Sequence, residues 1–466
     1  MQQLLSTKYH TIRLALCLFP LISIIGCNDE GEEEILYRLL EEEVVLGSQG
    51  DVNDFAAQKI THLRGSLTLQ SRNGDPSPIT DISGLTRLTT IEGSLTISGT
   101  SITQVDAFSN LTQLDGELVI SFNEALENLD GFIALGNASR VLETIRIRDN
   151  PKLTAINQFD NVVEIESGLF IWNNESLAEV EFSGLIRADI VGFSENPRWS
   201  DLTGFSNLQK VTQFRLSNTI LTSLEGLESL KEVDYIYLQE NHQITSIDQF
   251  SELTEVPIAV DFYDNKALAS VNFSNLRSTG FLRIHNTWMK DLSGFPALER
   301  VQDVQLTEND QLLDLEKLTD TSIEGWLWLS GSQITTLELV KDLDLSGGFG
   351  IQNSGITDLK GLEHMETIEE IYILDNRRLT SLDGLQNLSR IGDEISISRN
   401  PLLENLEGLN ALARVDNHVR IYGCTSLKDY CALELLVADG VAVFAEIEQN
   451  AYNPTLQDIR RGDCKL

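Results

Sequence analysis

Apolar and polar positions recur along this chain at steps of 22 to 24 residues, with one step of 27. Each repeat contains an apolar–any–apolar strand phrase, two free positions, and then a small residue that we call the ladder residue. In one repeat, Ile395-Ser396-Ile397 leads to Asn400. The fifteen ladder positions are Thr100, Asn123, Asn150, Asn174, Asn196, Thr219, Asn241, Asn265, Thr287, Asn309, Ser332, Ser354, Asn376, Asn400 and Cys424. A period in the twenties is typical of a solenoid, in which each coil buries its apolar face only against its neighbours.

The spacing after the ladder residue depends on the residue type that stands there. After Asn150 the next apolar residue, Leu153, comes three positions later, whereas after Thr100 the apolar Ile102 comes two positions later. An amide both donates and accepts hydrogen bonds, so Asn can satisfy the backbone of a wider turn, while a hydroxyl suits a tighter corner. We therefore expect the ladder side chains to be buried and bonded to backbone groups.

The repeats continue without interruption from Leu67 to Cys424, which predicts one elongated domain of residues 67–430. The segments between strands, such as Leu382-Asp383-Gly384-Leu385, are too short for full helices and predict extended turns or single helical turns. The predicted fold is mainly β, a right-handed parallel leucine-rich β-solenoid of about 15 coils.

The first 26 residues predict a secretory signal peptide. Leu14 to Ile25 is an apolar stretch of about a dozen residues, too short for a permanent transmembrane helix. Ile24-Ile25-Gly26-Cys27 resembles the lipobox of bacterial lipoproteins, and this resemblance implies cleavage before Cys27 and its acylation, with palmitate as the expected type of chain. An ordinary signal peptide with an incidental cysteine is the alternative.

An acidic run follows Cys27 and predicts a solvated tether over residues 27–43. Its position also resembles the export signal of Bacteroidota surface lipoproteins, which implies the outer membrane and its cell-surface side. Residues 44–66 are predicted to form an N-terminal cap, with a strand at Val44-Val45-Leu46 and a short helix from Asp51 to Ala57.

Cysteine usage agrees with export. Cys17 leaves with the signal, Cys27 takes the lipid and Cys424 stands in the ladder. Cys431 and Cys464 remain, and we expect them to form a disulfide that closes a C-terminal cap over residues 431–466.

The segment Ile91-Glu92-Gly93-Ser94-Leu95-Thr96-Ile97 carries the phrase I-x-G-x-L-x-I. Together with the repeats, it resembles the receptor L domain, the leucine-rich solenoid of insulin- and growth-factor-receptor ectodomains, and the leucine-rich surface lipoproteins of Bacteroidota. The array departs from the L domain because it is uninterrupted and has no flanking cysteine-rich modules. The resemblance implies a binding scaffold without naming a ligand.

Composition restricts the partners. The chain has 71 acidic and 34 basic residues, a net charge of −37, which opposes encounter with nucleic acid or anionic lipid. The six histidines lack metal-ligand spacing, and the sequence has no G-x-S-x-G or H-E-x-x-H motif, so we expect no enzyme, cofactor or metal. Two alternatives stay open: a catalytic pair of His285 with Asp261, and calcium at Asp-Asn pairs such as Asp264-Asn265.

The strand phrases also predict a binding face. Side chains alternate across a strand, so the second and fourth positions of each phrase point outward. These positions are rich in Arg, Trp and Tyr and poor in acids, which is the composition of interface hot spots. The candidate ligand-binding residues are Arg146, Arg148, Phe170, Trp172, Arg215, Tyr237, Tyr263, Arg283, His285 and Trp328. The alternative is sheet propensity together with local charge balance.

The sequence therefore predicts a lipid-anchored recognition protein that captures a peptide, protein or glycan on its open sheet face. A structural or adhesive surface component without one specific ligand is the alternative.

Overall fold

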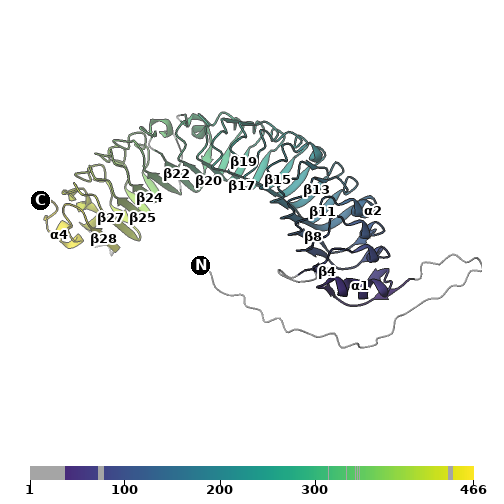
Figure 1. The fold of residues 1–466 in the computed structure, drawn as a ribbon. Coiled ribbons are helices and arrows are strands. Elements are labelled where there is room, and N and C mark those ends of the chain that lie inside the picture. Colours follow the sequence, from purple (N-terminus) through teal and green to yellow (C-terminus); the bar gives the residue numbers. More distant parts are fainter. Residues whose placement is uncertain are drawn as a thin grey trace, which may run out of the picture.

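The computed structural model describes residues 37–71, 78–312, 314–331, 333–341, 343, 345, 347–438 and 444–466. The predicted signal peptide, Cys27 and the ladder position Ser332 lie outside these residues. The described chain forms an arch whose strands line the concave side, with the two ends far apart (Figure 1). Twenty parallel strands make up its main sheet. The predicted mainly β, parallel solenoid is confirmed.

The strands of the main sheet are short near the ends of the arch and eight or nine residues long in most of the middle. They are β2 (Val44–Leu46), β4 (Leu67–Gln70), β6 (Leu95–Ser98), β8 (Glu117–Ser121), β9 (Val141–Arg148), β11 (Glu164–Trp172), β13 (Arg187–Ser194), β14 (Lys210–Ser217), β15 (Glu232–Gln239), β17 (Glu255–Tyr263), β19 (Ser278–His285), β20 (Arg300–Thr307), β21 (Ser322–Ile323), β22 (Trp326–Ser330), β23 (Gly348–Gln352), β24 (Thr367–Leu374), β25 (Arg390–Ser398), β26 (Arg414–Val415), β27 (His418–Tyr422) and β28 (Phe444–Glu448).

Smaller parallel sheets and short helices complete the coils. One further sheet joins β1 (Leu39–Leu40), β3 (His62–Leu63), β5 (Thr90–Ile91) and β7 (Gln113–Leu114), and two strand pairs join β10 (Ala155–Ile156) with β12 (Glu179–Val180) and β16 (Ser246–Ile247) with β18 (Ser270–Val271). The helices are α1 (Gln49–Ala57), α2 (Ile133–Ala138), α3 (Glu434–Ala438) and α4 (Leu456–Arg460). Of the helices that the structure describes, none is long and apolar enough to cross a membrane.

Alternation of side chains along each strand separates the core from the concave face. In β15, Ile236 and Leu238 are buried, while Tyr237 and Gln239 between and after them are partly exposed. Neighbouring strands keep the same phase, because Ile236 pairs with Phe214 on one side and with Val260 on the other. Equivalent positions therefore form continuous rows along the arch.

The ladder amides are buried and bridge successive coils. The Nδ2 of Asn150 donates to the carbonyl of Ile120 at 3.1 Å and to the Oδ1 of Asn174 at 3.2 Å. The Oδ1 of Asn150 accepts from the backbone N–H of Asn123 at 3.2 Å and from its Nδ2 at 3.0 Å. Each amide thus supplies hydrogen-bond partners to backbone groups that the turn leaves unpaired.

Hydroxyl residues begin new segments of the ladder. The Oγ1 of Thr219 donates to the Oδ1 of Asn241 at 2.7 Å, as the Oγ1 of Thr287 does to the Oδ1 of Asn309 at 2.9 Å. Within the residues that the structure describes, Asn196 makes no bond to Thr219. The shorter side chain can donate to the following amide but does not reach the preceding one, so it suits the tighter corner.

The residue before the ladder position turns the chain. Asp149, Asp264 and Asp375 there have φ values of 56°, 56° and 58°, in the left-handed region. Asn and Asp tolerate this conformation better than other residues with a side chain. The geometry of the turn thus accounts for the Asp-Asn pairs that the sequence left open as calcium sites.

A line of phenylalanines fills the back of the core. Phe159 stacks on Phe182 at 5.6 Å between ring centroids, and Phe182 stacks on Phe205 at 5.7 Å. All three rings are fully buried. They stand in or beside the predicted back turns, several of which are 3₁₀ helices, such as η4 (Thr203–Phe205).

The solenoid extends beyond both predicted limits. At the C-terminal end, β28 pairs in parallel with β27, and the Oδ1 of Asn450 accepts from the backbone N–H of Cys424 at 2.8 Å. Asn450 is therefore a further ladder residue inside the segment predicted as a cap, whose strand phrase Ala445-Glu446-Ile447 begins with a small residue. At the other end, β1 lies inside the predicted tether: it pairs in parallel with β3, and Leu40 packs partly buried against the core.

A helix covers the first coil of the solenoid, and a disulfide lies at its C-terminal end. Val44–Leu46 forms the strand expected in the N-terminal cap, and α1 covers the first coil with Val52 and Phe55 buried. Cys431 and Cys464 form a disulfide, with an S–S distance of 1.94 Å.

Replacing a ladder amide should destabilise the whole array. In Asn150→Ala, the Ile120 carbonyl and the Asn123 N–H lose their buried partner, at a cost of about 1–3 kcal/mol. Urea unfolding followed by circular dichroism measures this change. The control is Asn161→Ala. Its side chain is exposed and, among the described residues, bonds only to the side chain of Asn137, so the free energy of unfolding should change by less than about 0.5 kcal/mol. Equal effects of the two substitutions would contradict the ladder.

Candidate binding face

The concave face carries three rows of outward side chains. The predicted second and fourth positions form two rows. A third row lies two residues before the second position, because strands such as β15 and β19 begin several residues before the apolar phrase. It includes Tyr235, Phe281 and Trp326, which the sequence analysis missed because it searched only around the three-residue phrase. Period-2 alternation continued backward along the strand is the signal that finds them.

The ten candidate residues face outward but do not form one compact site. They lie on strands from β9 to β22, which are nine neighbours in the sheet. At about 4.8 Å per strand, this set extends roughly 40 Å along the arch. The side chains divide into three clusters, which we describe from the N-terminal end.

The first is the arginine cluster, formed by Arg146, Arg148, Phe170, Trp172 and Phe122. The guanidinium of Arg146 lies 4.4 Å from the ring centroid of Phe170. That of Arg148 lies 4.5 Å from the ring of Phe122 and 5.9 Å from that of Trp172. Cation–π contacts of this kind hold both guanidinium groups against the face.

The second is the tyrosine cluster, formed by Arg215, Tyr235, Tyr237, Asp261 and Arg283. Asp261 is only 3% exposed although it stands in an outward row. Its Oδ2 lies 3.1 Å from the Nη1 of Arg283, and its Oδ1 has no hydrogen-bond partner in the described part of the chain. Burial raises the pKa of Asp261, and Arg283 opposes that shift. An unpaired buried carboxylate oxygen is costly unless a ligand or water completes it.

His285 stands beside this cluster but does not pair with Asp261. The register places Arg283, and not His285, opposite Asp261. The ring of His285 stacks on Tyr263 at 4.3 Å, and its Nδ1 lies 2.7 Å from the Oγ1 of Thr307. The pair of His285 with Asp261 that the sequence left open is therefore not formed, because register on adjacent parallel strands joins positions of the same row.

The third is the tryptophan cluster, formed by Trp326, Trp328 and Tyr372. The ring of Tyr372 lies 5.4 Å from that of Trp326 and 6.1 Å from that of Trp328. Beside it is a hollow of about 260 Å³, whose other lining side chains include Phe281, Asp303 and Gln305. Only Trp328 of this cluster was a candidate residue.

Local charge balance explains part of the arginine content. Arg283 pairs with Asp261, and Arg420, farther along the face, pairs with Glu394 at 2.6 Å and Glu446 at 2.9 Å. Arg215 differs, because it is exposed and its Nη2 donates to the amide oxygen of Gln213 at 2.6 Å. Both readings of the face thus apply, to different residues.

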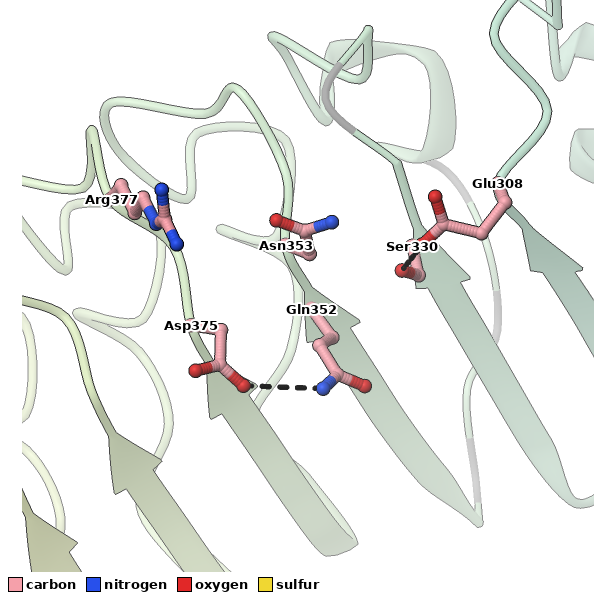
Figure 2. Close-up of a pocket in the computed structure, with 6 residues that line it drawn as sticks. All are labelled: Glu308, Ser330, Gln352, Asn353, Asp375 and Arg377. Atoms are coloured by element: carbon pink, nitrogen blue, oxygen red, sulfur yellow. Dashed lines mark hydrogen bonds between the residues drawn. The ribbon is translucent and has the colours of Figure 1, made fainter.

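The rim of the face, at the ends of the strands, is polar. A hollow of about 260 Å³ lies there. Figure 2 shows the residues that line it, which are Glu308, Ser330, Gln352, Asn353, Asp375 and Arg377. The Nε2 of Gln352 donates to Asp375 at 3.2 Å, and Arg399 holds the same carboxylate with two bonds. The bonds from Arg399 lower the pKa of Asp375. Its charge is thus already matched within the protein.

Comparison with known proteins finds one matching family model and distant relatives in two fungi. A family model described as the receptor L domain matches residues 61–165. Over 211 residues, 45% of this chain and 44% of the relative, the chain is 24% identical to the cell surface GPI-anchored protein ECM33 of Candida albicans. Over 279 residues, 59% of this chain and 50% of the relative, it is 24% identical to sporulation-specific protein 2 of Saccharomyces cerevisiae. The chain spans about half the length of these curated relatives.

Solved structures with some likeness include two Toll-family complexes. The Toll–Spätzle complex of Drosophila gives a TM-score of 0.39 at 13% identity, covering 88% of this chain and 61% of that one. The TLR13–ssRNA13 complex gives 0.35 at 13% identity, covering 86% and 73%. These scores support no inference about ligands. The receptor L-domain resemblance is supported in part, and the curated relatives are fungal, so the Bacteroidota lipoprotein reading stays a prediction.

Titration of His285 should change stability. Burial lowers its pKa below 6.5, so the unfolded chain takes up the proton first as pH falls. The free energy of unfolding should therefore decrease as the pH drops from 6.5 to the lowered pKa of His285. Below that pKa, His285 should cause no further decrease. Urea unfolding of the wild type and His285→Gln between about pH 8 and about pH 5 measures the difference. The control is His242→Gln, at an exposed turn. The same pH dependence in wild type and His285→Gln would contradict the burial.

Proposed function

We propose that this chain is a recognition protein of the cell surface whose concave face binds a peptide, protein or glycan. The observation that carries the proposal is the concentration of Arg, Trp and Tyr on that face in a chain with a net charge of −37. Tyr and Trp supply large contact areas at little loss of conformational freedom, and together with Arg they dominate binding energy at interfaces.

The buried carboxylate supports binding over a purely structural role. Asp261 keeps an unpaired oxygen under the tyrosine cluster, where the desolvation cost is offset only in part by the ion pair with Arg283. Proteins retain such costs chiefly at functional sites. A structural or adhesive component without a specific ligand is the second candidate, and it is favoured only by the regular charge pairing of residues such as Arg420.

The location rests on the relatives and the N-terminus. ECM33 of Candida albicans is named a cell surface GPI-anchored protein. We propose the surface for this chain too, with a lipid on Cys27 as the anchor in an outer membrane and no part played by nucleic acid. A non-enzymatic role, without a cofactor, is part of the same proposal.

An array experiment tests the binding face. The labelled full chain is applied to arrays of extracellular proteins, peptides and glycans, beside Trp172→Ala/Arg215→Ala. The control is Trp288→Ala/Lys341→Ala, which also removes one tryptophan and one positive charge, at exposed positions outside the strands. We expect signals of the wild type to fall at least about tenfold in the concave variant and to persist in the control.

Thermal unfolding of all three proteins shows whether they remain folded. Surface substitutions of this kind change the free energy of unfolding by less than about 0.5 kcal/mol. Array signals that survive equally in both variants would overturn the concave face as the ligand-binding surface.

A further inference from the structure

We propose that the tryptophan cluster binds one ring of a neutral glycan whose chain continues along the concave face. This inference rests on the proposed function and names the ligand class at one part of the same face. Three observations carry it: the glycines beneath the indoles, the arrangement of the rings, and the polar groups beside them.

Two glycines provide a flat seat for the tryptophans. In β23, Gly348 pairs with Trp326 and Gly350 pairs with Trp328. A Cβ at Gly350 would lie 2.2 Å from the Cε3 of Trp328, and one at Gly348 would lie 2.4 Å from the Cε2 of Trp326. The indoles therefore lie across the neighbouring strand, in the space that a side chain would take. Glycine weakens a strand interior, and two in a strand of five residues mark a place where a ring or ligand approaches the backbone closely.

The rings form an open platform on the concave side. Trp326, Trp328 and Tyr372 lie 5.4 to 6.3 Å apart between centroids, with interplanar angles of 42° to 44°. All three are partly exposed. The hydroxyl of Tyr372 donates to the Oε2 of Glu370 at 3.0 Å, which fixes the ring at the far side of Gly350. Such a platform presents ring faces to a ligand without closing over it.

The adjoining hollow has the size of part of a ligand. Its volume of about 260 Å³ lies below the roughly 300–1,000 Å³ typical of pockets that surround a whole small molecule. One ring of a longer chain suits it better, because the rest of the chain can lie along the rows of the face. Phe281 forms the opposite apolar wall.

Polar groups stand at the edge of the hollow. The Oδ1 of Asp303 accepts from the backbone N–H of Trp326 at 2.7 Å, which fixes the carboxylate beside the rings and leaves Oδ2 for a ligand. The Oε1 of Gln305 accepts from the Nε of Arg283 at 3.2 Å, which leaves its amide N–H groups as donors. Within the described residues, the Oδ2 of Asp303 and the Nε2 of Gln305 make no hydrogen bond.

This combination matches the chemistry of a sugar ring. A pyranose has C–H groups on its faces that pack on aromatic rings, and hydroxyls around its edge that need donors and acceptors. A nucleobase is also flat, but the net charge of −37 repels the phosphate backbone of a nucleic acid. An extended peptide binds best to a free sheet edge, and β22 and β23 are paired on both sides.

Titration with defined sugars tests the proposal. The probes are hexasaccharides of β-1,3-linked glucose, β-1,4-linked glucose, β-1,4-linked N-acetylglucosamine and α-linked mannose. Intrinsic tryptophan fluorescence and calorimetry report binding to the full chain. We expect at least one probe to bind, and its affinity to fall at least about tenfold in Trp328→Ala.

Gly350→Ala separates ring placement from ring chemistry. It keeps every aromatic and polar group but pushes the indole of Trp328 off its seat, so it should lose affinity as Trp328→Ala does. Trp288→Ala, at an exposed position outside the strands, serves as the control and should change the affinity less than about twofold. Thermal unfolding confirms that each variant is folded.

The failure of this inference is distinct from that of the proposed function. If no hexasaccharide binds while array signals still depend on Trp172 and Arg215, the glycan assignment is overturned and the recognition face stands. Binding that is unchanged in Trp328→Ala and Gly350→Ala places the sugar elsewhere and also overturns the inference. If substitutions on the concave face change neither the array signals nor the sugar binding, both the proposed function and the glycan inference are overturned.

Discussion

The buried amide ladder is the interaction on which this structure depends. The backbone N–H and C=O groups at the corner of a solenoid coil find no hydrogen-bond partner within that coil, so a neighbouring coil must supply one. Asn174 illustrates the solution: its Nδ2 donates to the carbonyl of Ile147, in the strand of the preceding coil, at 3.1 Å, and its backbone N–H donates to the Oδ1 of Asn196, in the following coil, at 3.0 Å. A contact made through such short side chains permits only one stagger of neighbouring coils. The register of the whole sheet follows from it.

That register in turn arranges the side chains of the concave face. Because equivalent positions stand side by side, a tryptophan on one strand meets whatever occupies the same position on the next. Trp328 meets Gly350, and Tyr372 follows on the strand beyond. The same rule places Asp261 against Arg283 and separates it from a direct pairing with His285. A shift of one residue would turn the aromatic rows into the core and dissolve all three clusters.

Much of the fold follows from the sequence because the repeat is periodic. The spacing of apolar pairs and ladder residues is enough to predict parallel coils, buried amides and short turns at the back. The sequence analysis did not predict Asn450 as a ladder residue, because Ala445 makes the preceding strand phrase weakly apolar. It did not predict β1, because the two leucines of that strand follow an acidic run. Such single coils at the ends lack the neighbours that make the pattern recognisable.

The site was less predictable than the fold. The sequence identifies Trp328 as outward, but the partnership of Trp326, Tyr372 and Gly350 depends on which strands are neighbours and on where each strand begins. The burial of Asp261 depends on side chains from adjacent strands that cover it.

Hydrogen exchange measured by mass spectrometry at the ladder tests the central claim most directly. The backbone N–H groups of Asn123, Asn150 and Asn174 should exchange as slowly as those of the central strands, because each donates to the amide of the next coil. Exchange as fast as in the exposed back turns would contradict the account.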